Sequence, residues 1–212
     1  MDPSCLDYCL TEDERDQFER DGFLVVENAL SPEMVRDLAA LVDRFDGEYR
    51  TIMGLGRYEV LELIDFVGKD DLFLELLDWP KTFPKVWGIL GWHIQLYTSH
   101  MNITPPVARE EQGVKRRLDW HQDSGRLNVD IESNPRPRIS IKVGYFLTDT
   151  TEEGRGNFYV VPGSHLQNEL NFPDADPAGA TTIRAAPGDA LFFDRRVWHV
   201  GCIETSKSED SS

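Results

Sequence analysis

The sequence predicts a mainly β protein with an α-helical N-terminal part, whose strands fold into a jelly-roll or barrel core. Two observations support this fold class. Residues 1–91 contain helix-start signals that are followed by apolar residues at helical spacing. From residue 92 onward, short apolar or alternating stretches are separated by turns rich in proline and glycine, as is typical of an all-β body.

The first helix is predicted from its cap. Residues 11–14 have the spacing of a capping box, so a helix is expected to begin there and to run to about Arg20. Gly22 is expected to end this helix. Residues 23–26 are continuous and apolar, and they predict a short buried strand.

A second helix is expected to begin at Pro32 with Ser31 as its N-cap, because proline suits the first helical position. Apolar residues behind this start recur at helical spacing and form one face: Met34, Val35, Leu38, Leu41, Val42 and Phe45. Residues 70–90 are also mostly helical in pattern, with expected breaks at Pro80 and Pro84.

The second half of the chain predicts a series of short strands. They are expected at residues 94–98, 138–148, 158–161, 181–185 and 190–193. We therefore predict one domain over residues 1–203, helical over 1–91 and a β core over 92–203. A disordered polar tail is expected at residues 204–212.

The charge balance excludes several classes of protein. The 212 residues carry 22 Lys and Arg against 38 Asp and Glu, a net charge of −16, which argues against a nucleic-acid binder or a protein held on anionic lipid. No apolar run approaches the ~18–20 residues needed to span a membrane. The N-terminus lacks the basic start and apolar stretch of a signal peptide.

Local composition adds two expectations. Cys5, Cys9 and Cys202 show no metal-type grouping, so free thiols in a reducing cytoplasm are expected. Residues 107–143 hold eight basic residues against six acidic ones, a local balance of 8 − 6 = +2 in an acidic chain. This stretch is compatible with a solvated loop face or with the attraction of an anionic ligand.

A candidate metal site begins with His121 and Asp123. Residues two apart on a strand share one face, so an imidazole and a carboxylate can reach one metal, although this pair also occurs often by chance. His199 is a candidate third ligand, and His165 is its alternative, although the tight turn before His165 favours a structural role. Two histidines and one carboxylate leave open positions, as Fe(II) requires when it also binds a co-substrate and O₂.

Four segments, in order along the chain, resemble the phytanoyl-CoA dioxygenase family. They are FERDGFLVV at 18–26, WHQD at 120–123, GNFYVVPGSH at 156–165, and PGD at 187–189 leading to WH at 198–199. This resemblance implies a double-stranded β-helix, jelly-roll or cupin-like, flanked by helices. It also implies an Fe(II)- and 2-oxoglutarate-dependent dioxygenase that hydroxylates an unactivated C–H bond of a small organic substrate. O₂ is consumed in that reaction, and succinate and CO₂ are released.

The resemblance also implies the site residues. The iron ligands of the family match His121, Asp123 and His199, and positions that line the 2-oxoglutarate pocket match Gln122, Tyr145 and His100. The implied cofactors are Fe(II), 2-oxoglutarate as co-substrate and O₂. No further catalytic residue is expected, and neither the substrate nor the oligomeric state can be inferred from the sequence.

One feature of the family is not found in the sequence after His199. The family places an arginine about ten residues beyond the distal histidine, where it pairs with the far carboxylate of 2-oxoglutarate. Here residues 209–211 are Glu-Asp-Ser, and Lys207 is the only cation in this stretch. We therefore expect the final strand and the arginine to be missing, as in a truncated or alternatively spliced product or a gene-model error. Possible replacements for the arginine are Arg138, Lys142 and Arg196.

Two other functions stay open at this point. A catalytically impaired or inactive family member would use the same fold for binding or regulation, which the missing arginine favours. A metal-dependent cupin-type enzyme would act without 2-oxoglutarate.

Overall fold

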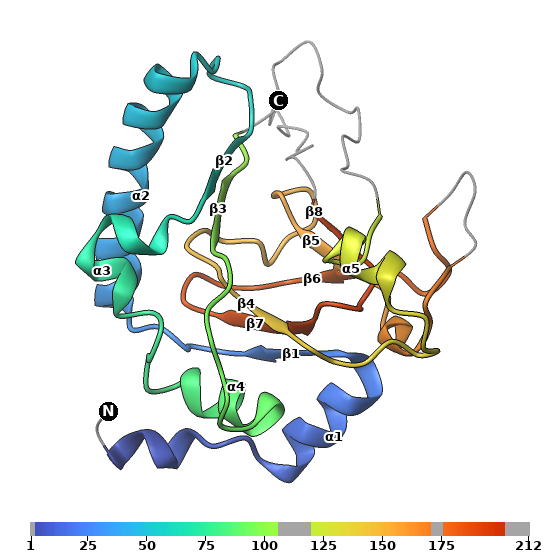
Figure 1. The fold of residues 1–212 in the computed structure, drawn as a ribbon. Helices are drawn as coiled ribbons and strands as arrows, with labels where there is room; N and C mark the ends of the chain where they lie inside the picture. The colour runs from blue at the N-terminus through green and yellow to red at the C-terminus, as the bar shows by residue number, and fades with distance from the viewer. Residues whose placement is uncertain (1–2, 106–119, 171–175, 202–212) are drawn as a thin grey trace, which may run out of the picture.

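The computed structural model of the protein describes residues 3–105, 120–170 and 176–201 (Figure 1). Most helices of the described residues lie before residue 92 and most strands lie after it. The strand at Leu61–Ile64 was not predicted and lies in the part expected to be helical. The expectations for Cys202, for the tail at 204–212 and for residues 107–119 of the basic stretch lie outside the described residues. No helix within the described ranges is long and apolar enough to cross a membrane.

The two helix starts predicted from their caps are confirmed. α1 (Glu12–Asp21) follows a capping box in which the Thr11 hydroxyl accepts a hydrogen bond from the Glu14 backbone N–H at 3.2 Å. α2 (Pro32–Met53) begins after Ser31, and the apolar face of this helix packs into the largest core cluster. Each cap satisfies backbone donors that the first turn of a helix leaves unpaired.

The remaining helical elements are short. They are η1 (Pro3–Tyr8), η2 (Val67–Lys69), α3 (Asp71–Leu74), α4 (Phe83–Leu90), α5 (Gly125–Asp130) and η4 (Ser164–Leu166). The expected break at Pro84 is wrong, because this proline lies in the first turn of α4. Its missing N–H costs no helical hydrogen bond there, so proline starts the helix instead of interrupting it.

The strands of the described residues form three antiparallel sheets. They are β1 (Phe23–Val26), β2 (Leu61–Ile64), β3 (His100–Ile103), β4 (Ile141–Tyr145), β5 (Phe158–Val160), β6 (Thr181–Ile183), β7 (Ala190–Asp194) and β8 (His199–Gly201). The strand orders are β1-β7-β4, β6-β5-β8 and β2-β3. β1 pairs with β7, with Phe23 opposite Phe193, and so ties the N-terminal part to the β core.

The prediction of a strand at residues 94–98 is wrong. The strand in this region is β3, which begins at His100 and pairs with β2. Alternation describes only side chains, whereas a strand also needs a neighbour that takes up its backbone hydrogen bonds. Within the described residues, the backbone bond formed at 94–98 is a local one, from Ile94 N to Trp92 O.

The two larger sheets pack against each other through β7. Leu191 and Phe193 point toward β5 and β6 and fill the space between the sheets. Ala190 and Phe192 alternate with them and pack against Phe18 of α1. In Figure 1, α1 and α4 lie beside β1, whereas β5, β6 and β8 lie on the other side of β4 and β7. All five residues of β7 are buried, because helices cover one face and the second sheet covers the other.

Gly22 links α1 to β1 in a conformation that only glycine adopts easily. Its φ is +81°, and a Cβ built there would lie 2.5 Å from both His165 Nδ1 and Val197 Cγ2. We expect Gly22→Ala to lower the free energy of unfolding by about 2 kcal/mol or more, from left-handed strain plus the clash. Urea denaturation measures this change.

Gly47 is the matched control for this prediction. It lies inside α2, and nothing stands within 4 Å of a Cβ built at that position. Gly47→Ala should therefore stabilise the protein by about 0.5–1 kcal/mol, because alanine loses less entropy in a helix. Equal effects of the two substitutions would contradict the structural role of Gly22.

Candidate metal centre

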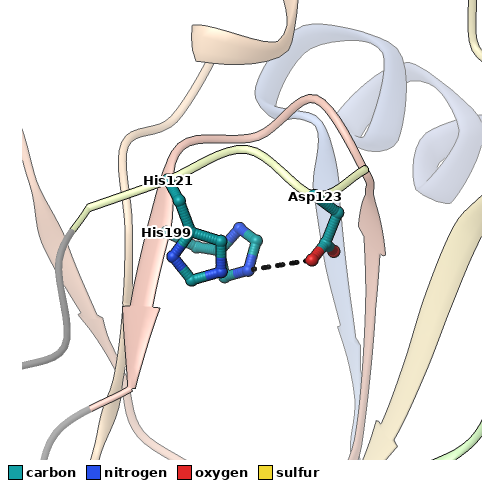
Figure 2. A group of neighbouring side chains, drawn as sticks. All are labelled: His121, Asp123 and His199. Carbon is teal, nitrogen blue, oxygen red and sulfur yellow. Dashed lines mark ion pairs between the residues drawn. The ribbon is translucent and has the colours of Figure 1, made fainter. Parts of the chain in front are cut away.

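Two histidines and one carboxylate meet at one end of the β core. His121, Asp123 and His199 each offer a ligand atom, and these atoms lie within 4.8 Å of one another. Figure 2 shows the two imidazole rings beside the Asp123 carboxylate. These three residues are the metal ligands predicted from the sequence, and the structure brings them together.

Backbone hydrogen bonds fix the positions of the three residues. His121 and His199 form an isolated antiparallel bridge, with N···O distances of 3.1 and 3.0 Å. The backbone N–H of Asp123 donates to the carbonyl of Arg195 at 2.9 Å. These bonds hold residues 121–123 against β8 and against the turn that contains Arg195 and precedes β8.

His199 is oriented as a metal ligand. Its Nδ1 lies 2.8 Å from the Val197 carbonyl, and because a carbonyl only accepts, Nδ1 carries the proton. Nε2 is then the basic nitrogen, and it lies 3.8 Å from Asp123 Oδ1. Burial is the main cause that lowers the pKa of His199 to about 4. The ring is therefore neutral near pH 7, the form that binds a metal.

Asp123 presents one engaged and one available oxygen. Oδ1 accepts a charge-assisted hydrogen bond from Lys142 Nζ at 2.8 Å. Oδ2 is buried and has no hydrogen-bond partner among the described residues. A buried carboxylate oxygen without a partner is costly, and a bound cation would satisfy it. The donor set therefore fits a divalent metal ion with positions left open for other ligands.

His165, the alternative third ligand, lies elsewhere. It is buried, and its Nε2 lies 3.1 Å from the Glu19 carbonyl. Its Nδ1 is close to Gly22, at the end of α1. His165, which is part of η4, therefore packs against the end of α1, as expected for a structural histidine.

The three predicted co-substrate positions do not join the triad. Gln122 is buried, and its amide nitrogen donates to the Gln167 and Arg196 carbonyls at 2.9 and 2.6 Å. Tyr145 lies on the face of β4 opposite Lys142, where its hydroxyl is 2.7 Å from that of Thr82. Burial raises the pKa of this tyrosine to about 12.

His100 lies on the separate β2-β3 sheet. Its Nδ1 is 3.0 Å from Glu62 Oε1, on the strand that pairs with β3. The assignment of Gln122, Tyr145 and His100 to a 2-oxoglutarate pocket rests on the family resemblance and stays a prediction.

Of the three cations considered as replacements for the arginine, only Lys142 touches a member of the triad. Arg138 forms a bidentate pair with Glu19 and also donates to Asp194 at 2.8 Å. Arg196 donates to Asp194 through its backbone and its guanidinium. Both arginines are therefore committed to a buried structural network.

The sequence pattern does not predict the link between Lys142 and Asp123. The available signal was a lysine in the middle of an alternating apolar strand, where its side chain shares a face with Gly144 and Phe146. An inward-facing lysine needs an acidic partner. The sequence alone does not say which acid supplies it.

Asp194 anchors the turn that supports the site. Its side chain is fully buried and accepts hydrogen bonds from Arg196 and Arg138. Burial alone raises the pKa of Asp194, but these hydrogen bonds outweigh burial and bring the pKa below its ordinary value. The neighbouring carbonyl of Arg195 accepts from Asp123 N, so the network reaches the metal ligand through one backbone bond.

Fold and site together define a jelly-roll protein in which two histidines and one aspartate fit a mononuclear metal centre. The chain belongs to the phytanoyl-CoA dioxygenase (PhyH) family, whose model matches residues 18–208. This family, whose members are iron- and 2-oxoglutarate-dependent oxygenases, is the one that the four motifs predicted, and the prediction is confirmed.

Individual relatives agree with this assignment. An ectoine dioxygenase from Bordetella parapertussis is 26% identical over 222 residues, which cover 90% of this chain and 69% of the relative. The crystal structure of iron-bound EctD from S. alaskensis has a TM-score of 0.68 at 18% identity, covering 92% of this chain and 72% of that one.

A second solved structure is HygX from Streptomyces hygroscopicus with nickel and 2-oxoglutarate bound. It has a TM-score of 0.68 at 16% identity and covers 94% of this chain and 83% of that one. These two structural matches show the fold, and the predicted fold class is confirmed.

Proposed function

We propose that this protein is an Fe(II)- and 2-oxoglutarate-dependent dioxygenase that hydroxylates an unactivated C–H bond of a small organic molecule. The observation that supports this function most directly is the triad itself. In a member of this family, two imidazoles and one carboxylate offer ligand atoms that lie within 4.8 Å of one another. Three protein ligands leave room at the metal for a co-substrate and O₂.

The residues of the chain have defined tasks in this reaction. Bound iron would supply the activation of O₂ while 2-oxoglutarate is converted to succinate and CO₂. The Val197 carbonyl orients His199, and Lys142 with the Arg195 carbonyl orients Asp123. The Phe158 and Phe193 rings pack on His199, at centroid distances of 5.1 and 4.9 Å, and shield that side of the site from water.

We propose a small-molecule substrate, for which the ectoine dioxygenase relative provides the supporting comparison. The net charge of −16 argues against nucleic acid as a partner. We also propose a cytoplasmic location, supported by Cys5 and Cys9, which are both free thiols. The pairing of β1 with β7 supports a single domain over residues 1–203.

An anaerobic titration tests the proposed activity. Addition of 2-oxoglutarate to the Fe(II)-loaded protein should produce a weak visible charge-transfer band, and subsequent O₂ should yield succinate. The control variant Asp130→Ala should behave like the unchanged protein. Asp130 is exposed, and among the contacts described it pairs only with Arg126, on the surface of α5. Absence of both the band and succinate would contradict the proposal. Oxidation of a substrate without 2-oxoglutarate would instead identify the cupin-type alternative.

A further inference from the structure

Hydrogen bonds hold the backbone of the candidate metal ligand Asp123 at both of its polar groups. Its N–H donates to the Arg195 carbonyl at 2.9 Å, and its own carbonyl accepts from Asn128 Nδ2 at 2.9 Å. The amide oxygen of Asn128 in turn accepts from the Arg195 guanidinium. The three residues thus form a closed ring of hydrogen bonds that includes the Asp123 backbone.

The ring lies in the interior of the protein. Asn128 is 8% exposed, and Arg195 is fully buried. The Arg195 guanidinium donates to two uncharged acceptors, which are Asn128 Oδ1 and the Pro137 carbonyl. A buried charge is costly when its donors lack partners, so this guanidinium holds the Asn128 amide in place. Arg136 Nε donates to the Asn128 backbone carbonyl at 2.9 Å and fixes the residue from a second side.

The ring needs a side chain that both donates and accepts. A guanidinium only donates and a backbone carbonyl only accepts, so the residue between them must accept from one and donate to the other. The planar amide of Asn128 does both, with its oxygen on the guanidinium and its nitrogen on the Asp123 carbonyl. An ionised aspartate at this position would accept from Arg195 but would have no donor for Asp123.

The chain turns sharply directly after Asp123. Ser124 has a φ of +63°, in the left-handed region that residues other than glycine rarely adopt. Such a conformation persists where the surrounding structure fixes it. Asn128 supports the turn on both sides, because its side chain holds the Asp123 carbonyl and its backbone N–H donates to the Ser124 carbonyl at 2.9 Å. Loss of the amide would remove one of these two supports, next to the carboxylate.

We propose that Asn128 is a positioning residue of the metal centre, which fixes the Asp123 backbone and so sets the place of the Asp123 carboxylate relative to His121 and His199. This inference rests on the proposed function, since it concerns the same metal. Asn128 acts through the Asp123 carbonyl and needs no contact with the metal or the substrate. Arg195 acts one step further away, because it fixes the amide that holds Asp123.

Two substitutions at position 128 separate positioning from stability. Asn128→Leu keeps the branched shape of the side chain and removes both the donor and the acceptor. Asn128→Asp keeps the acceptor for Arg195 and removes only the donor to Asp123. The matched control is Thr150→Val, which also removes one buried side-chain hydrogen bond, from Thr150 Oγ1 to the Ala185 carbonyl at 3.1 Å, outside the triad and its contacts.

The experiment uses Co²⁺ as a visible probe in the full chain, because its absorption spectrum reports the arrangement of its ligands. Asn128→Leu should lower the Co²⁺ affinity about 10–100-fold, the range for loss of a residue that supports a metal ligand, and should change the spectrum. Asn128→Asp should retain more stability than Asn128→Leu but should also change the spectrum. The spectrum is the readout for Asn128→Asp, since its added negative charge by itself attracts a cation.

Thermal unfolding of each metal-free variant measures stability separately. Thr150→Val should unfold at a lower temperature than the unchanged protein, with the same Co²⁺ affinity and spectrum. Asn128→Leu loses a partner of the buried guanidinium, so it should also unfold at a lower temperature. If Asn128→Leu does not fold, the spectrum of Asn128→Asp decides the question.

Three outcomes would overturn the inference. The first is an unchanged Co²⁺ affinity and spectrum in folded Asn128→Leu. The second is an unchanged spectrum in Asn128→Asp, which would show that Asn128 only stabilises the fold. The third is an unchanged protein that binds no Co²⁺, because the metal site itself would then be wrong. A protein that binds Co²⁺ but forms no succinate with Fe(II) and 2-oxoglutarate would overturn the proposed function alone.

Discussion

Replacing Asp123 with alanine is expected to abolish metal binding and, with it, all 2-oxoglutarate turnover. The substitution removes the only carboxylate of the triad and its buried, unpartnered Oδ2. Loss of a residue that only supports a metal ligand typically lowers metal affinity about 10–100-fold. Loss of the ligand itself should lower the affinity for Fe(II) or Co²⁺ by more than this. A metal titration followed by absorption or calorimetry measures this change.

The exposed Asp130→Ala variant, which leaves the triad intact, controls for the loss of one negative charge. Its metal affinity should match that of the unchanged protein. The Asp123→Ala variant should stay folded, because the Asp123 backbone N–H, which donates to the Arg195 carbonyl, is retained. Full metal affinity in Asp123→Ala would show that the ligand assignment is wrong.

The Asp194→Asn substitution is expected to destabilise the fold strongly. Asp194 is fully buried and pairs with both Arg138 and Arg196. The neutral amide of asparagine removes the negative charge that these two guanidinium groups share. Breaking a buried ion pair from one side typically costs about 3–5 kcal/mol. Urea denaturation should show this loss of unfolding free energy. Asp37→Asn is the control, because its pair with Arg36 is exposed and should change stability by less than about 0.5 kcal/mol.

The acid sensitivity of the protein should change in the same variant. Hydrogen bonds from Arg196 and Arg138 hold the pKa of Asp194 below its ordinary value despite burial. A carboxyl with a lowered folded pKa stabilises the protein above its unfolded pKa of about 3.9, and this contribution is lost as the pH falls through the folded value. The unchanged protein should therefore lose stability more steeply below about pH 4 than Asp194→Asn. Parallel acid-denaturation curves would contradict this account.

Local signals predicted much of the fold. The caps at Thr11 and Ser31 defined two helix starts because a cap involves residues only a few positions apart. β7 was also expected, since continuous apolar residues suit a strand that is covered on both faces. Residues 94–98 show the limit of such signals, because their alternation carries no information about a backbone partner.

The candidate site could be predicted only in part. The spacing of His121 and Asp123 placed two ligands on one segment, and the tight turn before His165 favoured His199 as the third ligand without deciding between them. Tertiary packing decides between them, because His165 is turned toward Glu19 whereas His199 faces Asp123. The contact of Lys142 with Asp123 likewise depends on how β4 lies beside the triad segment, which periodicity does not specify.

The pairing of β1 with β7 also constrains the order of events during synthesis. Phe23 is synthesised 193 − 23 = 170 residues before its partner Phe193. Contacts this distant in sequence slow folding, because closing the long intervening loop costs entropy before the contact is gained. The central sheet therefore cannot close until β7 has been synthesised, and His199 emerges later still. We expect the nascent chain to expose an apolar N-terminal strand during this interval and to depend on chaperones.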